Sequence, residues 1–204
     1  MAMIEISHLS LTRETRRVIS DFSASCVAGS ITAIIGANGS GKSTLLSAIA
    51  GDLPITSGTI AIDGTFLSDL ALVDQASLRS VVNQDQLFWL AFTVRQVIEM
   101  GQDEKTRGRI DHVMTELGIA DIAEQSVLTL SGGQAQRVSI ARALVRDTPI
   151  YLFDEPFASQ DRASTEKLIA IFKDMRAAGK TLVIVAHLGE VELEWCDQII
   201  KDLA

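Results

Sequence analysis

One nine-residue stretch, residues 36–44, limits the possible folds of this chain more than any other. It matches the pattern Gly-x-x-x-x-Gly-Lys-[Ser/Thr], with apolar residues typical of a buried strand before it and of a helix after it. Its glycines let backbone N–H groups turn inward and the helix start adds its positive dipole end, so we expect a loop that binds an anionic polyphosphate. Lys42 is expected to reach the β- and γ-phosphates, and the Ser43 hydroxyl to bind Mg²⁺. The predicted contacts are Gly36, Asn38, Gly39, Ser40, Gly41, Lys42, Ser43 and Thr44.

Composition excludes several classes of protein. The chain has 204 residues, of which 47% are hydrophobic and 22% charged, and this is typical of one globular domain. A formal net charge of −8 argues against a nucleic-acid binder, because such proteins cluster Lys and Arg. No apolar run approaches the roughly 20 residues that span a bilayer, and no secretory signal is visible, so we expect a cytosolic protein. Cys26 and Cys196 stand alone in the sequence, which favours buried free thiols.

The first part of the chain has the period of antiparallel strands. Apolar residues alternate with polar ones over residues 4–11, with a slip near His8, and again over residues 22–26. Residues 59–62 run into Asp63-Gly64, a favoured hairpin turn. Because the strand before a phosphate loop normally belongs to a parallel sheet, the sequence predicts a mixed sheet.

A helical period begins near Thr93 and continues to about Arg146. Ile110, Val113 and Met114 show it, with Gly118 at a stop position. Continuous apolar runs typical of buried parallel strands resume at residues 150–153 and 181–186, with another helix between them. We therefore expect an α/β fold with an inserted helical region.

Two acidic residues follow the first of those late strands. Asp154 and Glu155 end the apolar run 150–153. In a protein with a phosphate loop, such an Asp holds Mg²⁺. Adjacent side chains leaving a buried strand point in different directions, so Glu155 is predicted to face the nucleotide and take a proton from the attacking water.

A second glycine-containing motif precedes the helix that includes Val138. It consists of Ser131, Gly132, Gly133 and Gln134. Ser131 alone reads as a helix N-cap, whereas the paired glycines suggest backbone N–H groups close to an anion. The chain would then have two helix starts that bind anions, but only one lysine and one Asp-Glu pair to serve them. One explanation is that the second helix start binds the nucleotide of another copy of the chain.

Together these motifs resemble the ATP-binding subunit of an ABC transporter. The resemblance rests on the phosphate loop at residues 36–44, Gln84, the signature at residues 130–134, the strand 150–154 and His187, and it covers essentially the whole chain. It implies a P-loop NTPase core with a mixed sheet, an N-terminal antiparallel β subdomain (about 1–30 and 56–82) and a helical subdomain (about 87–146), within one domain spanning residues 1–204.

The resemblance also assigns roles to single residues. Gln84 would sense Mg²⁺ and the attacking water, and His187 would contact the γ-phosphate and steady Glu155. Asp161 would cross the interface between two subunits. The cluster at Phe88, Trp89, Leu90 and Phe92 would receive the membrane subunit, although core packing explains some of these side chains equally well.

The chain departs from the family pattern in two places. Arg13 stands where the family usually has an aromatic residue that stacks on adenine. A planar guanidinium can stack on a base, so we expect weaker or less base-selective ATP binding. Gln160 stands where an apolar residue is commoner, which leaves the contacts of its loop open.

The sequence thus predicts an Mg²⁺-dependent ATPase that hydrolyses ATP as a head-to-tail homodimer around two nucleotides. Its partners would be integral membrane permease subunits, with or without a substrate-binding protein, and it would lie on the cytoplasmic face of the membrane. Short stretches near residues 51–54 and 92–101 resemble importers of haem, iron chelates or cobalamin. A haem or small-solute exporter, a non-transport ATPase such as an iron–sulfur assembly scaffold, and a small-molecule kinase remain as alternatives.

Overall fold

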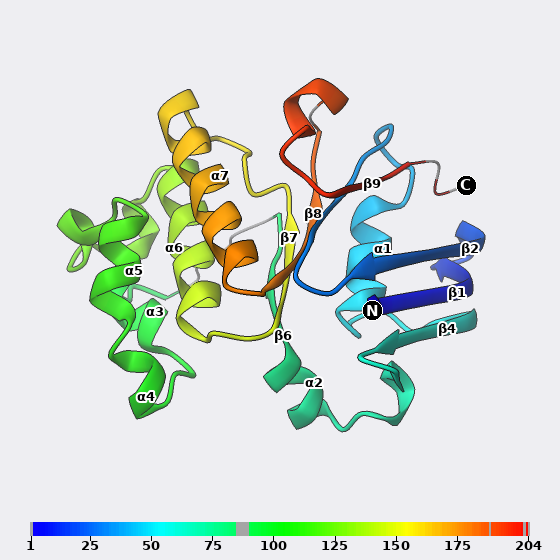
Figure 1. The fold of residues 1–204 in the computed structure, drawn as a ribbon. Coiled ribbons are helices and arrows are strands. Elements are labelled where there is room, and N and C mark those ends of the chain that lie inside the picture. The colour runs from blue at the N-terminus through cyan, green and yellow to red at the C-terminus, as the bar shows by residue number, and fades with distance from the viewer. Residues whose placement is uncertain (1, 85–89, 188, 202, 204) are drawn as a thin grey trace.

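The computed structural model describes residues 2–84, 90–187, 189–201 and 203, and shows two β-sheets with helices between and beside them (Figure 1). Within these residues, no helix is both long and apolar enough to cross a lipid bilayer. The described chain therefore has the α/β class expected from its sequence, with antiparallel strands first and parallel strands later.

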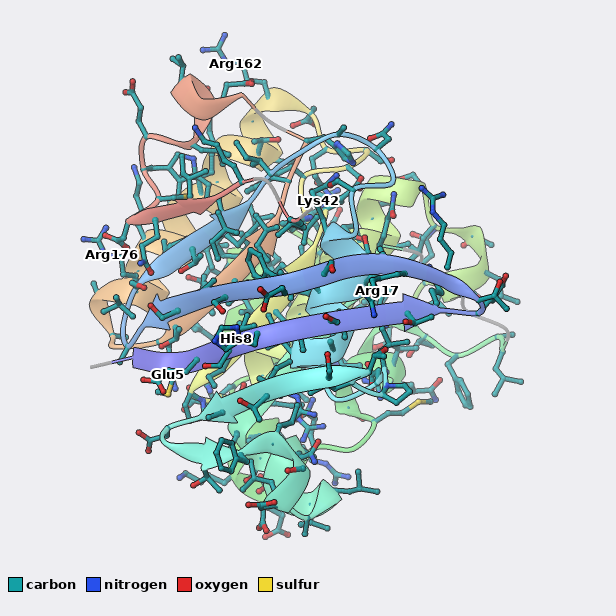
Figure 2. The ribbon with its side chains drawn as sticks, turned by 90° about the vertical axis from the view of Figure 1, so that its right-hand side faces the viewer. Glu5, His8, Arg17, Lys42, Arg162 and Arg176 are labelled. Atoms are coloured by element: carbon teal, nitrogen blue, oxygen red, sulfur yellow. The ribbon has the colours of Figure 1, made fainter. Side chains whose placement is uncertain are left out.

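The N-terminal strands form an antiparallel sheet of order β2-β1-β4-β5. The predicted slip near His8 is confirmed, because the register shifts between Ile6 and Leu9 and His8 has a φ of 50°. Asp63 and Gly64 connect the last two strands with positive φ angles, as the hairpin signal predicted. Figure 2 shows this sheet from its exposed side. The strands are β1 (Ala2–Arg13), β2 (Arg16–Val27), β4 (Ser57–Ile62) and β5 (Thr65–Phe66).

The remaining strands form a separate parallel sheet of order β6-β7-β8-β3-β9. The antiparallel strands pair with one another and not with β3, so the parallel and antiparallel ladders lie in two sheets and not in the single mixed sheet that the sequence suggested. Hydrophobic alternation identifies a strand but not the strand it pairs with, which explains the difference. The strands are β3 (Ile31–Ile34), β6 (Arg79–Val82), β7 (Ile150–Asp154), β8 (Thr181–Val185) and β9 (Gln198–Ile200).

Helix α1 (Lys42–Ile49) packs between the two sheets. Alternate residues of the parallel strands serve two hydrophobic cores: Leu152 and Val183 face α1 and the antiparallel sheet, whereas Phe153 and Ile184 face the helices on the other side. Because both faces are covered, most residues of these strands are apolar. The start of α1 is thereby held at the carboxyl edge of the parallel sheet.

The helices on the far side of the parallel sheet gather around α6 (Figure 1). The predicted apolar positions Ile110, Val113 and Met114 are buried in α5, and Gly118 has a φ of 65° just after it. Capping boxes at Thr93 and Ser131 begin α3 and α6. The helices other than α1 are α2 (Leu72–Leu78), α3 (Val94–Glu99), α4 (Glu104–Arg107), α5 (Ile110–Glu116), α6 (Gly132–Val145) and α7 (Arg162–Ala177), with 3₁₀ turns at Leu67–Asp69, Ala120–Ile122, Val127–Thr129 and Glu190–Leu193.

Candidate nucleotide-binding site

The phosphate loop lies between the end of β3 and the start of α1. Its three glycines, at positions 36, 39 and 41, have φ angles of 153°, 78° and 99°, which residues with a Cβ rarely adopt. Lys42 is only 5% exposed, and its Nζ donates to the carbonyl oxygens of Gly36 (2.9 Å) and Ala37 (3.0 Å). The loop therefore wraps around its own ammonium group, with the first turn of α1 directly behind it.

The residues of the loop fit a polyphosphate. Among the described residues, the Oγ of Ser40 is buried and has no hydrogen-bond partner, although it lies inside the loop. A buried hydroxyl without a partner is unfavourable unless a ligand or water supplies one. Ser40, Lys42 and the backbone N–H groups thus offer donors to a bound anion in one small volume.

Asp154 faces the start of α1 from the end of β7. The Oγ of Ser43 donates to its Oδ1 at 3.2 Å, and Asp154 is 7% exposed. Burial raises the pKa of Asp154 above its usual range, and the Glu155 charge adds to this, while the Ser43 hydrogen bond and Lys42 oppose it. Ser43 and Asp154 are hard oxygen donors of the kind that Mg²⁺ prefers. Within the described part of the chain, no group of three or more His, Cys, Asp or Glu could hold a metal alone, so further ligands would come from nucleotide and water.

Glu155 points away from Asp154, as predicted for neighbouring residues at a strand end. Its Oε2 accepts from Gln84 Nε2 at 3.1 Å, and its Oε1 lies 2.7 Å from His187 Nε2. Gln84, Glu155 and His187 follow β6, β7 and β8, which are neighbours in the parallel sheet, so their carboxyl ends bring the three side chains together. Glu155 has a φ of 50°, an uncommon value for a residue with a side chain. The structure thus places two predicted residues, Gln84 and His187, against the carboxylate of the third, Glu155.

A hollow of about 870 Å³ joins the phosphate loop to this carboxylate and to the β1–β2 hairpin. It contains most of the residues that the sequence predicted for nucleotide binding in a single chain, and it adds Glu14, Arg16 and Val18. These three residues are close to Arg13 in sequence, and this closeness could have predicted that they line the same site. The lining residues are Arg13, Glu14, Arg16, Val18, Asn38, Gly39, Gly41, Lys42, Ser43, Thr44, Gln84, Glu155 and His187.

The second predicted anion motif, residues 131–134, does not line this hollow. Ser131 is exposed and caps α6, because its Oγ accepts from the Gln134 N–H at 3.3 Å and the Gln134 Oε1 accepts from the Ser131 N–H at 2.9 Å. A Cβ on Gly133 would lie 2.6 Å from the Ser159 carbonyl oxygen, so close packing requires that glycine. Asp161 caps α7, and the hydrogen bond from Ser164 N–H lowers the pKa of its carboxyl.

Comparison with known proteins decides the family. The family model described as "ABC transporter" matches residues 19–158, more than half of the chain. This chain belongs to the ABC transporter family. The zinc transport system ATP-binding protein TroB of Treponema pallidum (strain Nichols) is 34% identical over 206 residues, which cover 97% of this chain and 77% of TroB. The hemin import ATP-binding protein HmuV of Nocardia farcinica (strain IFM 10152) is 35% identical, over 90% of this chain and 67% of HmuV.

A solved structure agrees with this assignment. A dimeric ATP-binding cassette in a post-hydrolysis state, bound to ADP and Pi, superposes with a TM-score of 0.87 at 25% identity, over 98% of this chain and 94% of that one. The chain is thus an ATP-binding, ATP-hydrolysing subunit of the ABC transporter family. The predicted family and fold class are confirmed.

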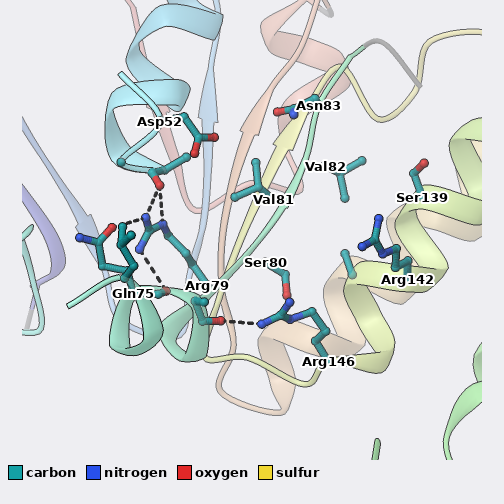
Figure 3. A pocket seen from close by; sticks show the side chains of 15 residues that line it. Asp52, Gln75, Arg79, Ser80, Val81, Val82, Asn83, Ser139, Arg142 and Arg146 are labelled. Atoms are coloured by element: carbon teal, nitrogen blue, oxygen red, sulfur yellow. Dashed lines mark hydrogen bonds between the residues drawn. The ribbon is translucent and has the colours of Figure 1, made fainter. Parts of the chain in front are cut away.

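This ABC ATPase has a second hollow of about 570 Å³, between the end of α1, α2, β6 and α6 (Figure 3). Arg79 closes its base: it is 8% exposed and donates to the Ala50 carbonyl and, at 2.7 Å, to Gln75 Oε1. Arg142 and Arg146 border it from α6, and Arg146 donates to the Ala76 carbonyl at 2.9 Å.

Part of the predicted membrane-docking cluster can be placed. Phe88 and Trp89 lie outside the described residues. Leu90 is 62% exposed, whereas Phe92 is partly buried and packs on the core beside the helices. Of the two described members, Phe92 therefore follows the core-packing alternative and Leu90 remains at the surface.

Proposed function

We propose that two copies of this chain bind head-to-tail, so that each ATP is held by the phosphate loop of one copy and covered by the signature residues 131–134 of the other. One observation carries this proposal: the signature lies outside the 870 Å³ nucleotide hollow of its own chain, yet begins α6 with an exposed serine. An exposed helix start favours an anion, and in this proposal the anion is the nucleotide held by another copy.

Within one site, the chain's own groups divide the work. Lys42 and the loop N–H groups offset the negative charge of the phosphates. Ser43 and Asp154, with Gln84, would hold Mg²⁺, which supplies further positive charge to the phosphates when bound. The hydrogen bond between Ser43 and Asp154 supports this assignment, because it already places both oxygen donors side by side.

Glu155 is the proposed general base. It accepts a proton from the attacking water as the water oxygen bonds to the γ-phosphorus and the bond to the leaving ADP oxygen breaks. Gln84 and His187 hold one carboxylate oxygen each, at 3.1 Å and 2.7 Å, and so fix the direction in which Glu155 presents its lone pairs.

The proposed partner is a membrane permease, with this chain on the cytoplasmic face. The named relatives act in zinc transport and hemin import, so we propose import of a metal or metal compound such as haem, an iron chelate or cobalamin. The second hollow offers a docking place, because Arg142 lies on its border and the exposed Leu72 lines it. A cytoplasmic segment of the permease with acidic and apolar side chains would complement both.

Mixing two inactive variants tests the shared site. Lys42→Ala damages the phosphate loop and Ser131→Arg damages the signature, so each variant alone should lose ATP hydrolysis. In a head-to-tail mixed dimer, one site combines the intact loop with the intact signature, and an equal mixture should recover about a quarter of the wild-type rate. Ser126→Arg is the matched control, because Ser126 also caps a helical turn but lies outside the signature. Failure of the mixture to exceed its components would exclude the shared site.

Glu155→Gln tests the base. The glutamine keeps a similar size, so the variant should still bind ATP and dimerise, while hydrolysis falls by about 10²–10⁴-fold. Turnover near the wild-type rate would remove Glu155 from this role.

A further inference from the structure

A buried arginine lies at the start of β6 without an acidic partner. Arg79 is 8% exposed, and among the residues that the structure describes no carboxylate forms an ion pair with it. Burial lowers the pKa of its guanidinium below the usual range, while the charge of Asp52 opposes this shift. A buried cation is unfavourable unless acceptors satisfy its N–H groups, so the acceptors around Arg79 fix where its guanidinium lies.

These acceptors belong to two helices (Figure 3). The Nε and Nη2 of Arg79 donate to the carbonyl oxygen of Ala50, the residue that caps the C-terminal end of α1. Its Nη1 and Nη2 donate to the backbone carbonyl and the side-chain oxygen of Gln75 in α2, at 3.0 Å and 2.7 Å. Gln75 in turn donates to the carbonyl oxygens of Leu67 and Leu70. One side chain therefore joins the first residue of β6 to the end of α1 and to the turn before α2.

The end of α1 suits a cation. The last carbonyl groups of a helix lack partners within the helix and carry the negative end of its dipole. Close approach requires a glycine at position 51, because a Cβ there would lie 2.7 Å from Arg79 Nη2. Arg79 thus holds the end of α1 by charge as well as by hydrogen bonds.

Both elements that Arg79 joins carry residues of the nucleotide site at their other ends. Helix α1 begins with Lys42 and Ser43, and β6 leads directly to Gln84. Helix α1 packs between the two sheets, whereas β6 lies at the edge of the parallel sheet, with β7 as its neighbour among the described strands. Gln84 is five positions after Arg79, so at most about 18 Å of extended chain joins them. A shift of Arg79 would therefore reach Gln84 with little slack.

We propose that Arg79 is a positioning residue for ATP hydrolysis, because by joining the end of α1 to the start of β6 it fixes the distance between Gln84 and the phosphate loop. The inference rests on the proposed function in assigning Gln84 to Mg²⁺ and to the Glu155 carboxylate. Arg79 is not among the residues that line the nucleotide hollow, so it acts through Gln84, whose Nε2 lies 3.1 Å from Glu155 Oε2. Loss of Arg79 is expected to displace Gln84, while Lys42 keeps its place because α1 is packed between the sheets.

The test is a double-variant cycle between Arg79 and Gln84 with two readouts. One readout is ATP hydrolysis by the full chain, and the other is the calorimetric affinity for ATP in Mg²⁺ and in EDTA, which requires no turnover. Arg79→Met keeps an unbranched side chain without the N–H groups. We expect it to lower both kcat and the gain in ATP affinity that Mg²⁺ provides by about ten-fold, as loss of a group that orients a metal ligand does. The affinity for ATP in EDTA should stay within about two-fold of the wild type, the limit for independent sites.

The cycle separates positioning from a general loss of stability. In the Gln84→Ala background, Arg79→Met should change kcat and the Mg²⁺ gain by less than about two-fold, because the side chain that it positions is gone. Arg79→Lys keeps a cation and a donor for the Ala50 carbonyl but loses the planar fork, so it should lie between the wild type and Arg79→Met. Arg95→Met is the matched control, since Arg95 also joins two helices, through Asp111 at 2.6 Å, but does not contact β6. It should match the wild type in both readouts.

Equal losses from Arg79→Met in the wild type and in the Gln84→Ala background would overturn the inference, and so would losses no larger than those of Arg95→Met. Failure of the proposed function gives a different result, because Gln84→Ala alone would then leave turnover and the Mg²⁺ gain unchanged, and this inference would fail with it. Thermal melts identify any loss of fold. If Arg79→Met does not fold, the same cycle with Arg79→Lys decides by the same outcomes.

Discussion

Substituting Gly41 by alanine tests how tightly the phosphate loop is packed. Gly41 has φ 99° and ψ 8°, a left-handed conformation that costs an L-residue about 1–2 kcal/mol. Its added Cβ would lie 2.9 Å from Val18 Cγ1 and 3.1 Å from Ile19 Cγ1, and overpacking of this kind costs about 1–3 kcal/mol. We therefore expect Gly41→Ala to lower the free energy of unfolding by about 2–5 kcal/mol. For a domain of this size the melting temperature should fall by about 4–20 °C.

Gly39→Ala is the control within the same loop. Gly39 also has a positive φ, 78°, but a Cβ there would have no heavy atom within 4 Å. Only the backbone cost remains, so the expected loss is about 1–2 kcal/mol. Both variants are measured by urea denaturation without nucleotide, so that altered ligand binding does not contribute.

A double variant isolates the contact itself. Val18→Ala removes the methyl group nearest to the added Cβ, so it should cost less in the Gly41→Ala background than in the wild type. Equal losses in Gly39→Ala and Gly41→Ala, with additive effects of Val18→Ala, would refute the conclusion that β2 packs directly on the phosphate loop.

Two further predictions concern titratable groups. Because burial raises the pKa of Asp154, the stability that its protonated form provides is complete below the unfolded pKa of about 3.9 and is lost as the pH rises through the folded pKa. Asp154→Asn keeps an acceptor for the Ser43 hydroxyl and removes the buried charge. In nucleotide-free buffer without Mg²⁺, the variant should be more stable than the wild type at pH 7.5 but not near pH 3. A variant less stable than the wild type at pH 7.5 would contradict the raised pKa of Asp154. Burial also raises the pKa of Cys26 to about 11 and that of Cys196 to about 12, so iodoacetamide at pH 8 should modify neither thiol until urea unfolds the chain, as mass spectrometry of the native protein would show.

The sequence predicts the site best where the chemistry follows from strand geometry. The directions of Asp154 and Glu155 could be foreseen because neighbouring residues at a strand end point to opposite sides. The meeting of Glu155 with Gln84 and His187 required the order of the parallel strands, β6-β7-β8, which no local pattern contains. The family resemblance predicted that these three residues act together, whereas residue spacing alone did not.

The sequence interpretation could not foresee the packing of the glycine pair at 132–133 against a distant segment of the chain. The paired glycines at 132 and 133 suggested an approaching anion, yet a Cβ on Gly133 would meet the Ser159 carbonyl oxygen at 2.6 Å. Gln160, which stands where the family usually has an apolar residue, donates from its Nε2 to the Gly133 carbonyl oxygen at 3.0 Å. This hydrogen bond is the contact that the sequence left open. Ser159 is 26 positions away in sequence, so a local composition of Ser, Gly and Gln cannot distinguish packing from anion binding.

These contacts connect the proposed base with the signature inside one chain. The segment from Glu155 to Asp161 is fixed at its start by the hydrogen bond from Glu155 N–H to the Val185 carbonyl (3.0 Å), and near its end by the contact of Ser159 and Gln160 with Gly133. Both Glu155 and Ser159 hold positive φ angles, 50° and 60°, so the segment has little freedom to absorb a displacement by local adjustment. A shift of the start of α6 would therefore be expected to press on Ser159 and on the backbone that orients Glu155. In the head-to-tail pair that we propose, α6 would cover the partner's nucleotide, and this segment would then join the two ATP sites through packing and backbone geometry.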